Sequence, residues 1–337
     1  MLLLCNYYVT YRCNADCEFC HFGYSTELNK TPFAKEEDVL NNLPQLKELG
    51  VRFIDFTGGE PLLHKSIPIF LEEARKLKMQ TSITTNCLLY PKFAEKIAGK
   101  VNLLHFSLDS PDEEEHDRIR RVKSFRSVIE SIKIAKSIGE FPDILFTVTN
   151  DTYKKLPQMY ELSKKYGLVL IVNPVFSYFG NPGLSMKALD YIEEFCEGKL
   201  DIYINPSFIE LRRRGGNDPN NPLCKAVSRV IVISPYNEII LPCYHFANRT
   251  IPINKPIKEI RDSEEIKFYM KMEGRFEFCK GCTVNCYFEP SFAFPTNYFG
   301  LMSVPSKIYY GFNKLVKQKF LKLENKFISI KNRKSEP

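Results

Sequence analysis

Residues 11–23 read YRCNADCEFCHFG and place three cysteines, Cys13, Cys17 and Cys20, on one short stretch, with three and then two residues between them. Thiolates at this spacing can reach three corners of one iron–sulfur cluster from a single tight loop. A structural zinc site or a ferredoxin cluster takes a fourth protein ligand, but the next cysteine in the chain is Cys87. The stretch therefore predicts a metal site with one corner left open for another molecule.

Around this stretch, short apolar runs alternate with longer helix-patterned segments. Strands are predicted at 2–8, 51–56, 81–85, 101–107, 144–149 and 168–173, and helices at 35–49, 67–77, 91–98, 125–138, 154–166 and 185–197. Such alternation indicates parallel strands joined by right-handed crossovers. We therefore expect an α/β fold, a partial (β/α)6 TIM-like barrel that stays open because only six strands are predicted.

The alternation ends after about Pro206, where the composition changes to a loop, RRRGGNDPNNP, and then to the hairpin-like run VIVISPYNEIILPC. We accordingly expect a barrel over residues 1–205 and a smaller domain over 215–292. An aromatic linker and a basic amphipathic tail are expected over 293–337.

Polar residues follow several of the predicted strands. They are Thr57-Gly58-Gly59-Glu60-Pro61, Thr84-Thr85-Asn86, Ser107-Leu108-Asp109-Ser110 and Thr149-Asn150. Functional residues of parallel α/β folds collect at the carboxyl ends of the strands. We therefore expect these groups to meet the cysteine stretch at one rim of the barrel.

The three cysteines, the aromatic Phe19 just before the last of them, and the GGEP run at 58–61 together resemble the radical S-adenosylmethionine (SAM) superfamily. The resemblance covers roughly residues 1–205. It implies that Cys13, Cys17 and Cys20 hold three irons of a 4Fe–4S cluster, and that SAM binds the fourth iron. It also implies reductive cleavage of SAM to a 5′-deoxyadenosyl radical that abstracts hydrogen from a substrate.

The same resemblance implies a set of SAM-binding residues. Gly58 and Gly59 would let the backbone pass close to the methionyl end, and Glu60 would accept a hydrogen bond from the methionyl ammonium. Ser107 and Asp109 would meet the ribose hydroxyls, with Asn86 and Thr149 as further candidates. A capping or turn role is the alternative for Ser107 and Asp109.

A second group of cysteines follows in the smaller domain: Cys224, Cys243, Cys279, Cys282 and Cys286. It resembles the twitch and SPASM extensions of radical SAM barrels, which hold auxiliary iron–sulfur clusters, although a full SPASM pattern has seven cysteines. One auxiliary 4Fe–4S cluster is therefore expected, on Cys224, Cys243, Cys279 and Cys282. Cys286 could replace one of the four or be a spare buried thiol, and zinc is the competing metal. Cys5, Cys87 and Cys196 are expected to be core residues.

The overall composition bears on nucleic-acid binding and on the compartment in which the protein works. The 337 residues carry a net charge of +7, but nine Lys or Arg and two Glu after position 306 account for all of it. A neutral body argues against nucleic-acid binding. The first thirteen residues suggest a buried strand rather than a signal peptide, and eleven cysteines suit a reducing cytoplasm.

From Val316 onward, apolar residues recur at steps of four and three as Phe320, Leu323, Phe327 and Ile330. This spacing predicts an amphipathic helix with lysines on its other faces. The helix could pack on the body or lie on a membrane surface, helped by the aromatic residues Tyr298, Phe299, Tyr309, Tyr310 and Phe312.

The sequence thus predicts a radical SAM enzyme that acts on a peptide, a small metabolite or a lipid precursor and takes electrons from a flavodoxin- or ferredoxin-type protein. GTP cyclisation of the molybdopterin type is disfavoured, because the chain ends in NRKSEP without a terminal glycine pair. The alternative from another class is a non-catalytic zinc- or iron–sulfur-binding module.

Overall fold

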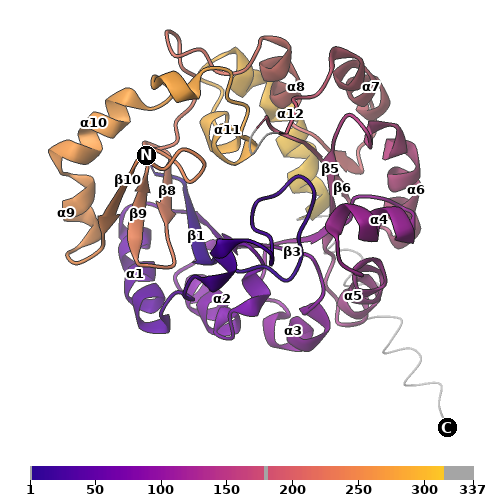
Figure 1. Cartoon of the computed structure of the whole chain (residues 1–337), viewed down its shortest axis with the longest axis horizontal. Coiled ribbons are helices and arrows are strands. Elements are labelled where there is room, and N and C mark those ends of the chain that lie inside the picture. The colour runs from indigo at the N-terminus through magenta and orange to yellow at the C-terminus, as the bar shows by residue number, and fades with distance from the viewer. Residues whose placement is uncertain (1, 178–180, 315–337) are drawn as a thin grey trace.

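The structure is a computed structural model that describes residues 2–177 and 181–314. A single curved sheet runs through it in the order β10-β9-β8-β1-β2-β3-β4-β5-β6-β7, and the helices surround this sheet to form an incomplete ring (Figure 1). The strands are β1 (Leu4–Thr10), β2 (Phe53–Gly58), β3 (Gln80–Thr85), β4 (Leu103–Ser107), β5 (Asp143–Val148), β6 (Leu170–Pro174), β7 (Ile202–Tyr203), β8 (Val230–Ile233), β9 (Glu238–Leu241) and β10 (Arg249–Pro252).

The strands from β1 to β7 pair in parallel, which confirms the predicted α/β partial barrel. Helices connect them, as right-handed crossovers require. The α-helices are α1 (Glu36–Glu48), α2 (Ile67–Lys76), α3 (Tyr90–Ile97), α4 (Glu113–Arg120), α5 (Phe125–Ser137), α6 (Leu156–Tyr166), α7 (Met186–Cys196), α8 (Pro206–Arg213), α9 (Ile257–Arg261), α10 (Glu264–Met272), α11 (Asn285–Ser291) and α12 (Tyr298–Phe312). Short 3₁₀ turns add η1 (Glu27–Lys30), η2 (Pro61–Leu63), η3 (Tyr153–Lys155) and η4 (Glu277–Cys279).

The six strands and six helices predicted for the barrel all form, with ends shifted by two residues or fewer. Six of the seven residues of β1 are buried, as expected for a strand covered on both faces. Large apolar side chains from successive strands, among them Tyr7, Phe56, Phe106 and Phe146, are fully buried. This core fixes the strands whose carboxyl ends carry the polar groups.

The chain after α8 (Pro206–Arg213) extends the barrel sheet. Strand β8 pairs in parallel with β1, and β9 and β10 follow as antiparallel strands at the same edge. A separate apolar cluster, which includes Phe208, Tyr287, Phe288 and Phe292, packs next to Tyr8 of β1. The boundaries at 205, 215 and 292 stay a prediction.

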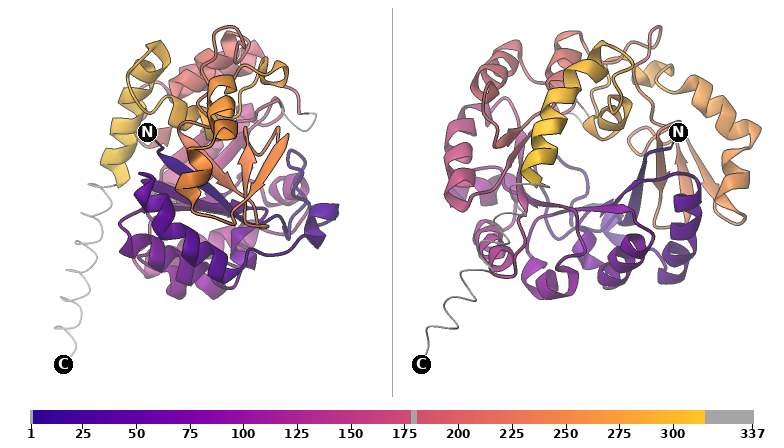
Figure 2. Two further views of the ribbon diagram at one scale, coloured as in Figure 1. Left: turned by 90° about the vertical axis from the view of Figure 1, so that its left-hand side faces the viewer. Right: turned by 180° about the vertical axis from the view of Figure 1, so that it is seen from behind.

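Helix α12 (Tyr298–Phe312) occupies much of the segment expected to be an aromatic linker. The view from behind shows that α12 crosses the ring on the face that points away from the viewer in Figure 1 (Figure 2). Among the described residues, no helix is both long and apolar enough to cross a membrane. The amphipathic tail predicted from Val316 lies outside the described residues.

Candidate functional site

The cysteine stretch forms a loop at the carboxyl end of β1. Its backbone is tied on one side to the turn after β2, since the amides of Gly59 and Glu60 donate to the carbonyls of Thr10 and Arg12 at 3.1 and 2.9 Å. On the other side, the amides of Asp16 and Glu18 donate to the carbonyls of Arg120 and Ile119 in the last turn of α4. Two other parts of the chain, the turn after β2 and the end of α4, therefore fix the backbone of the loop.

The two glycines of the GGEP run are required by the close approach of these two loops. A Cβ on Gly58 would lie 1.8 Å from the carbonyl oxygen of Thr10, and one on Gly59 would lie 2.2 Å from that of Arg12. Gly58 also has φ +140°, a conformation that favours glycine. The glycines thus let the GGEP turn touch the backbone of the cysteine loop. Their predicted closeness to the methionyl end of SAM stays a prediction.

Glu60 is buried and links the ends of β2 and β3. Its carboxylate accepts hydrogen bonds from the Leu62 amide (3.1 Å), the Thr85 hydroxyl (2.8 Å) and the Asn86 amide (2.9 Å). Burial raises the pKa of this carboxyl to about 7, although these hydrogen bonds and the charge of Arg120 lower it. A carboxylate oxygen can accept two hydrogen bonds, so Oε2, which accepts one here, has the capacity to accept a second from the predicted ligand ammonium.

Asp109 has a protein partner that the sequence did not reveal. It is fully buried, and its carboxylate contacts Nε of Arg120 at 2.5 Å and accepts from the Thr147 amide at 3.0 Å. The guanidinium of Arg120 continues to the cysteine loop, where Nη1 lies 3.6 Å from Sγ of Cys17. Arg120 thus connects Asp109 to the cysteine loop. A ribose bound to Asp109, as predicted, would compete with Arg120 for the carboxylate.

The three remaining predicted SAM-binding residues lie at the same rim. Asn86 is buried and donates to Oδ1 of Asn14 in the cysteine loop at 2.8 Å. Ser107 ends β4 and is 5% exposed. Thr149 follows β5 and takes part in a turn, where its hydroxyl accepts from the amides of Asp151 and Thr152. Their predicted role in SAM binding stays open.

The thiols of the first loop lie near one another and near Glu60. Burial raises the pKa of Cys13 to about 12, with further contributions from Glu60, Cys17 and Cys20. Cys20 is an exposed residue, but the protein around its thiol still raises the pKa to about 11, with Cys17 adding to the shift. Metal binding has to displace these protons, since thiolates are the ligands.

The second group of cysteines surrounds a small cavity. Cys224, Cys243, Cys279 and Cys282 all line it, together with the apolar residues Ala226, Pro242, Phe246 and Val284. Burial raises the pKa of Cys243 to about 12 and that of Cys279 to about 11, and the neighbouring thiols add to both shifts. Residues far apart in the sequence thus bring four thiols to one enclosed place.

Asn217 holds this second site together. Its side-chain oxygen accepts from the amide of Leu223, and its side-chain nitrogen donates to the carbonyls of Gly274 (2.7 Å) and Cys279 (3.2 Å). Its backbone pairs with Gly281 and Cys282. Sequence reasoning missed Asn217, because asparagine in a GGNDPNNP run reads as an ordinary loop residue.

Cys286 lies apart from the other four. It does not line the cavity, and the residue as a whole is exposed. The surrounding protein raises the pKa of its thiol to about 11, and Asp55 of β2 adds to the shift. This thiol therefore lies near the barrel strands.

The other cysteines are buried, as expected for core residues: Cys5 and Cys87 are fully buried, and Cys196 is 9% exposed.

Across residues 2–177 and 181–314, no three His, Cys, Asp or Glu side chains are gathered closely enough to hold a single metal ion.

Comparison with known proteins agrees with this geometry. Residues 7–163 match the model of the radical SAM superfamily. These residues form a radical SAM domain, and the chain is an enzyme. Its cofactors are accordingly a 4Fe–4S cluster and SAM.

Curated relatives extend beyond the matched domain. A protein named probable GTP 3′,8-cyclase from Methanococcus maripaludis strain C6 is 28% identical over 291 residues, which cover 81% of this chain and 94% of the relative. A protein of the same name from Methanocaldococcus jannaschii is 24% identical and covers 74% of this chain and 88% of the relative.

Solved structures share the fold. SuiB of Streptococcus suis, bound to its precursor peptide SuiA, superposes with a TM-score of 0.66 at 18% identity, over 84% of this chain and 70% of SuiB. The enzyme anSMEcpe with bound AdoMet gives a TM-score of 0.62 at 17% identity, over 94% of this chain and 99% of that one. At such identities the likeness concerns the fold alone.

Proposed function

We propose that Cys13, Cys17 and Cys20 hold the catalytic 4Fe–4S cluster and that SAM binds at its open corner, next to Glu60 and the rim residues. The observation that carries the proposal is the tight contact between the cysteine loop and the Gly58–Gly59 turn, which brings the two motifs together. Such a cluster with bound SAM supplies a 5′-deoxyadenosyl radical that abstracts hydrogen from a substrate. The residues of the cysteine loop and the rim would hold and orient these groups and exclude water around them.

We also propose that Cys224, Cys243, Cys279 and Cys282 hold an auxiliary 4Fe–4S cluster in a domain of the twitch or SPASM kind, over about residues 215–292. The four thiols that line one cavity support this ligand set. Four thiolates would occupy all four irons, so no iron would remain open for substrate. Electron transfer during a dehydrogenation or a bond-forming oxidation is then the role that suits the cluster.

The chemistry can be tested on anaerobically purified protein reconstituted with iron and sulfide. We expect about eight irons per chain, for two four-iron clusters, and release of 5′-deoxyadenosine from SAM under reductant. Cys17→Ala should abolish this release, whereas Cys196→Ala should keep it, because Cys196 belongs to the core. If Cys17→Ala released as much 5′-deoxyadenosine as the wild type, the catalytic assignment would be wrong. Zinc content in place of iron would support the non-catalytic module.

GTP cyclisation is the second candidate function. It is disfavoured above, but curated relatives named probable GTP 3′,8-cyclase align over 81% of the chain. Their name makes GTP a specific candidate substrate for this chain. Addition of GTP should then raise the rate of 5′-deoxyadenosine release and yield a cyclised nucleotide detectable by mass spectrometry. An unchanged rate leaves a peptide, a small metabolite or a lipid precursor as the substrate.

We further propose a flavodoxin- or ferredoxin-type protein as the electron donor, since SAM cleavage consumes one low-potential electron. The arrangement can be tested by replacing the chemical reductant with a reduced flavodoxin. Turnover with flavodoxin should then saturate with its concentration, as expected for a docking partner. A rate that rises linearly without saturation would argue against a specific complex.

A further inference from the structure

The outward face of α12 carries a continuous row of exposed apolar side chains. Tyr298, Leu301, Ile308, Tyr309 and Phe312 are each at least half exposed, at 52, 59, 63, 50 and 57%. Pro305 is also exposed. At 3.6 residues per turn, these six positions fall within an arc about 100° wide. They define what we call the outer face of α12.

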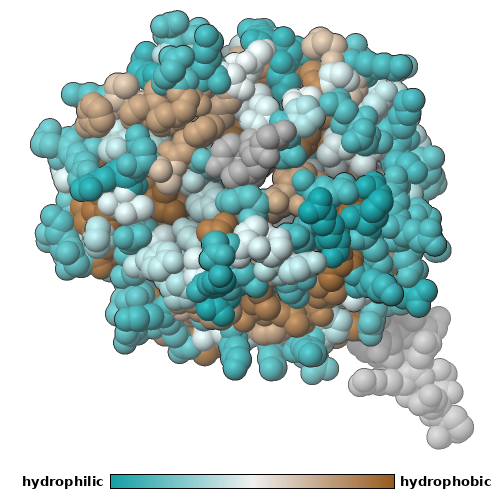
Figure 3. All heavy atoms as spheres, viewed as in Figure 1, coloured by the Kyte–Doolittle hydropathy of each residue, from teal (hydrophilic) through white to brown (hydrophobic). Residues whose placement is uncertain are grey.

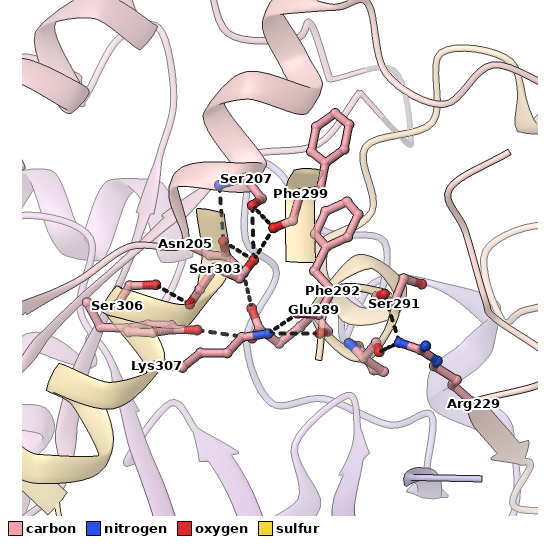
Figure 4. A network of polar contacts seen from close by, with 12 residues as sticks. Asn205, Ser207, Arg229, Glu289, Ser291, Phe292, Phe299, Ser303, Ser306 and Lys307 are labelled. Carbon is pink, nitrogen blue, oxygen red and sulfur yellow. Dashed lines mark hydrogen bonds and ion pairs between the residues drawn. The ribbon is translucent and has the colours of Figure 1, made fainter. Parts of the chain in front are cut away.

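The opposite face of α12 is anchored to the body by polar contacts (Figure 4). The hydroxyl of Ser303 donates to Asn205 at 2.9 Å, and that of Ser207 donates to the carbonyl of Phe299 at 2.5 Å. Lys307 contacts the carboxylate of Glu289 at 3.0 Å and the carbonyl of Phe292 at 2.8 Å. Lys307 is the one charged residue of α12, and these inward contacts mean that the helix itself places no charged side chain on its outer face.

The end of α12 is anchored as well. The hydroxyl of Tyr310 donates to the carboxylate of Asp143 at 2.7 Å, and the ammonium of Lys314 lies 2.6 Å from the same carboxylate. Asp143 is fully buried and is the first residue of β5. The helix therefore ends at the amino end of the barrel strands, whereas the cysteine loop follows the carboxyl end of β1.

The amino acids that follow this helix are strongly basic. Residues 315–337 contain seven Lys or Arg and two Glu, a net charge of +5 in 23 positions. An apolar helix face followed directly by a basic segment is the combination that binds to anionic lipid surfaces. On the face shown in Figure 3, in contrast, hydrophilic residues cover most of the periphery.

We propose that the outer face of α12 docks on an anionic lipid bilayer, with the basic charge of residues 315–337 drawing the protein to that surface. Leu200, which is 56% exposed, adds to the apolar contact. Its carbonyl accepts a hydrogen bond from the side chain of Asn313 at the end of the helix. Docking through this face leaves the cysteine rim on the far side of the barrel, open to substrate and reductant. The inference does not rest on the proposed reaction.

The test uses the full-length holoprotein and sedimentation with vesicles of phosphatidylcholine alone or with about one third phosphatidylglycerol. We expect at least roughly tenfold tighter binding to the anionic vesicles, and a decline of that binding as salt rises. The variant Leu301→Ser/Ile308→Ser/Phe312→Ser should lose most of the binding. The matched control Ile69→Ser/Met186→Ser/Phe268→Ser replaces three residues exposed elsewhere, at 44, 54 and 53%, and should bind as the wild type does.

A charge-reversal variant separates the two contributions. Lys317→Glu/Lys319→Glu/Lys322→Glu should remove the preference for anionic vesicles while circular dichroism and cluster absorption stay those of the wild type. Wild-type protein that stays in the supernatant with both vesicle types would overturn the proposal. So would a dimer in light scattering that the triple serine variant dissociates, because the outer face would then join two copies of the chain.

Discussion

The imidazole of His21 lies 3.1 Å, through Nε2, from the hydroxyl of Tyr244, and this contact joins the two groups of cysteines. His21 directly follows Cys20, and Tyr244 directly follows Cys243. The Tyr244 ring also stacks on Tyr8 with a centroid distance of 4.4 Å. The bond and the ring stacking together fix the separation of the two cysteine loops.

This contact leads to the first prediction. Tyr244→Ala removes both the hydrogen bond and the stacked ring, so the two loops should move relative to each other. The spin–spin interaction between the two reduced clusters, seen as line broadening in electron paramagnetic resonance, should change. Tyr244→Phe keeps the ring and should lose only about 1 kcal/mol of stability, with the interaction retained. An unchanged spectrum for Tyr244→Ala would show that the loops are held without this residue.

A second prediction concerns the buried ion pair between Arg120 and Asp109. Arg120→Gln leaves the carboxylate buried without its charged partner, which should cost about 3–5 kcal/mol of stability. The variant also removes the N–H group and the positive charge next to Cys17, so the midpoint potential of the first cluster should fall. Asp109→Asn combined with Arg120→Gln should recover part of the stability, because no buried charge is then left unpaired. A potential equal to that of the wild type would mean that Arg120 only supports the fold.

Much of the fold could be predicted because the barrel strands and helices follow simple periodicities. Helix α4 (Glu113–Arg120) was missed, since its sequence EEEHDRIR has too few apolar residues to show a helical stripe. Its two buried polar side chains, His116 and Arg120, contact Asp109. Arg120 could not be singled out from sequence, because a buried arginine and an exposed one look alike in a charged run.

The residues after 205 were harder to place for another reason. Strand β8 pairs with β1 across more than 200 positions, and no local pattern reports such pairing.

The third prediction concerns the two glycines of the GGEP turn. In Gly58→Ala or Gly59→Ala, the new methyl group meets backbone atoms at 1.8 or 2.2 Å, and backbone cannot turn away as a side chain can. We expect a cost at or above the 1–3 kcal/mol usual for overpacking, together with poor iron loading at the first site. Gly183→Ala is the control, because a Cβ there meets no atom within 4 Å. Normal iron content and SAM cleavage in Gly59→Ala would show that the loop contact is dispensable.

The fourth prediction is a pH dependence of stability through His116. Its Nδ1 accepts from the Asp109 amide at 3.1 Å, so Nε2 carries the proton and donates to Ser124. Burial, assisted by the charge of Arg120, lowers the pKa of His116 to about 3. The unfolded chain, with an ordinary pKa of about 6.5, therefore binds a proton that the folded protein excludes. The stability from neutral His116 is present above pH 6.5 and declines as the pH falls toward 3.

When the pH falls from 7.5 to 5, protonation of His116 in the unfolded chain should lower the stability of the wild type by about 2 kcal/mol. His116→Gln cannot take up that proton, so the variant should be less stable than the wild type at pH 7.5 and the gap should narrow by pH 5. Urea unfolding at both pH values measures the gap. Equal slopes of stability against pH in the two proteins would contradict the assignment.

The last prediction separates the five cysteines of the second group. Cys282 lines the cavity with three other thiols, whereas Cys286 lies near Asp55 of β2. Cys282→Ser should therefore lower the iron content from about eight to about four per chain, since one four-iron cluster is lost. Cys286→Ser should keep about eight irons, and Cys282→Ser should still release 5′-deoxyadenosine, because its first cysteine loop is intact. If Cys286→Ser instead lost four irons and Cys282→Ser kept all of them, Cys286 and not Cys282 would be the cluster ligand.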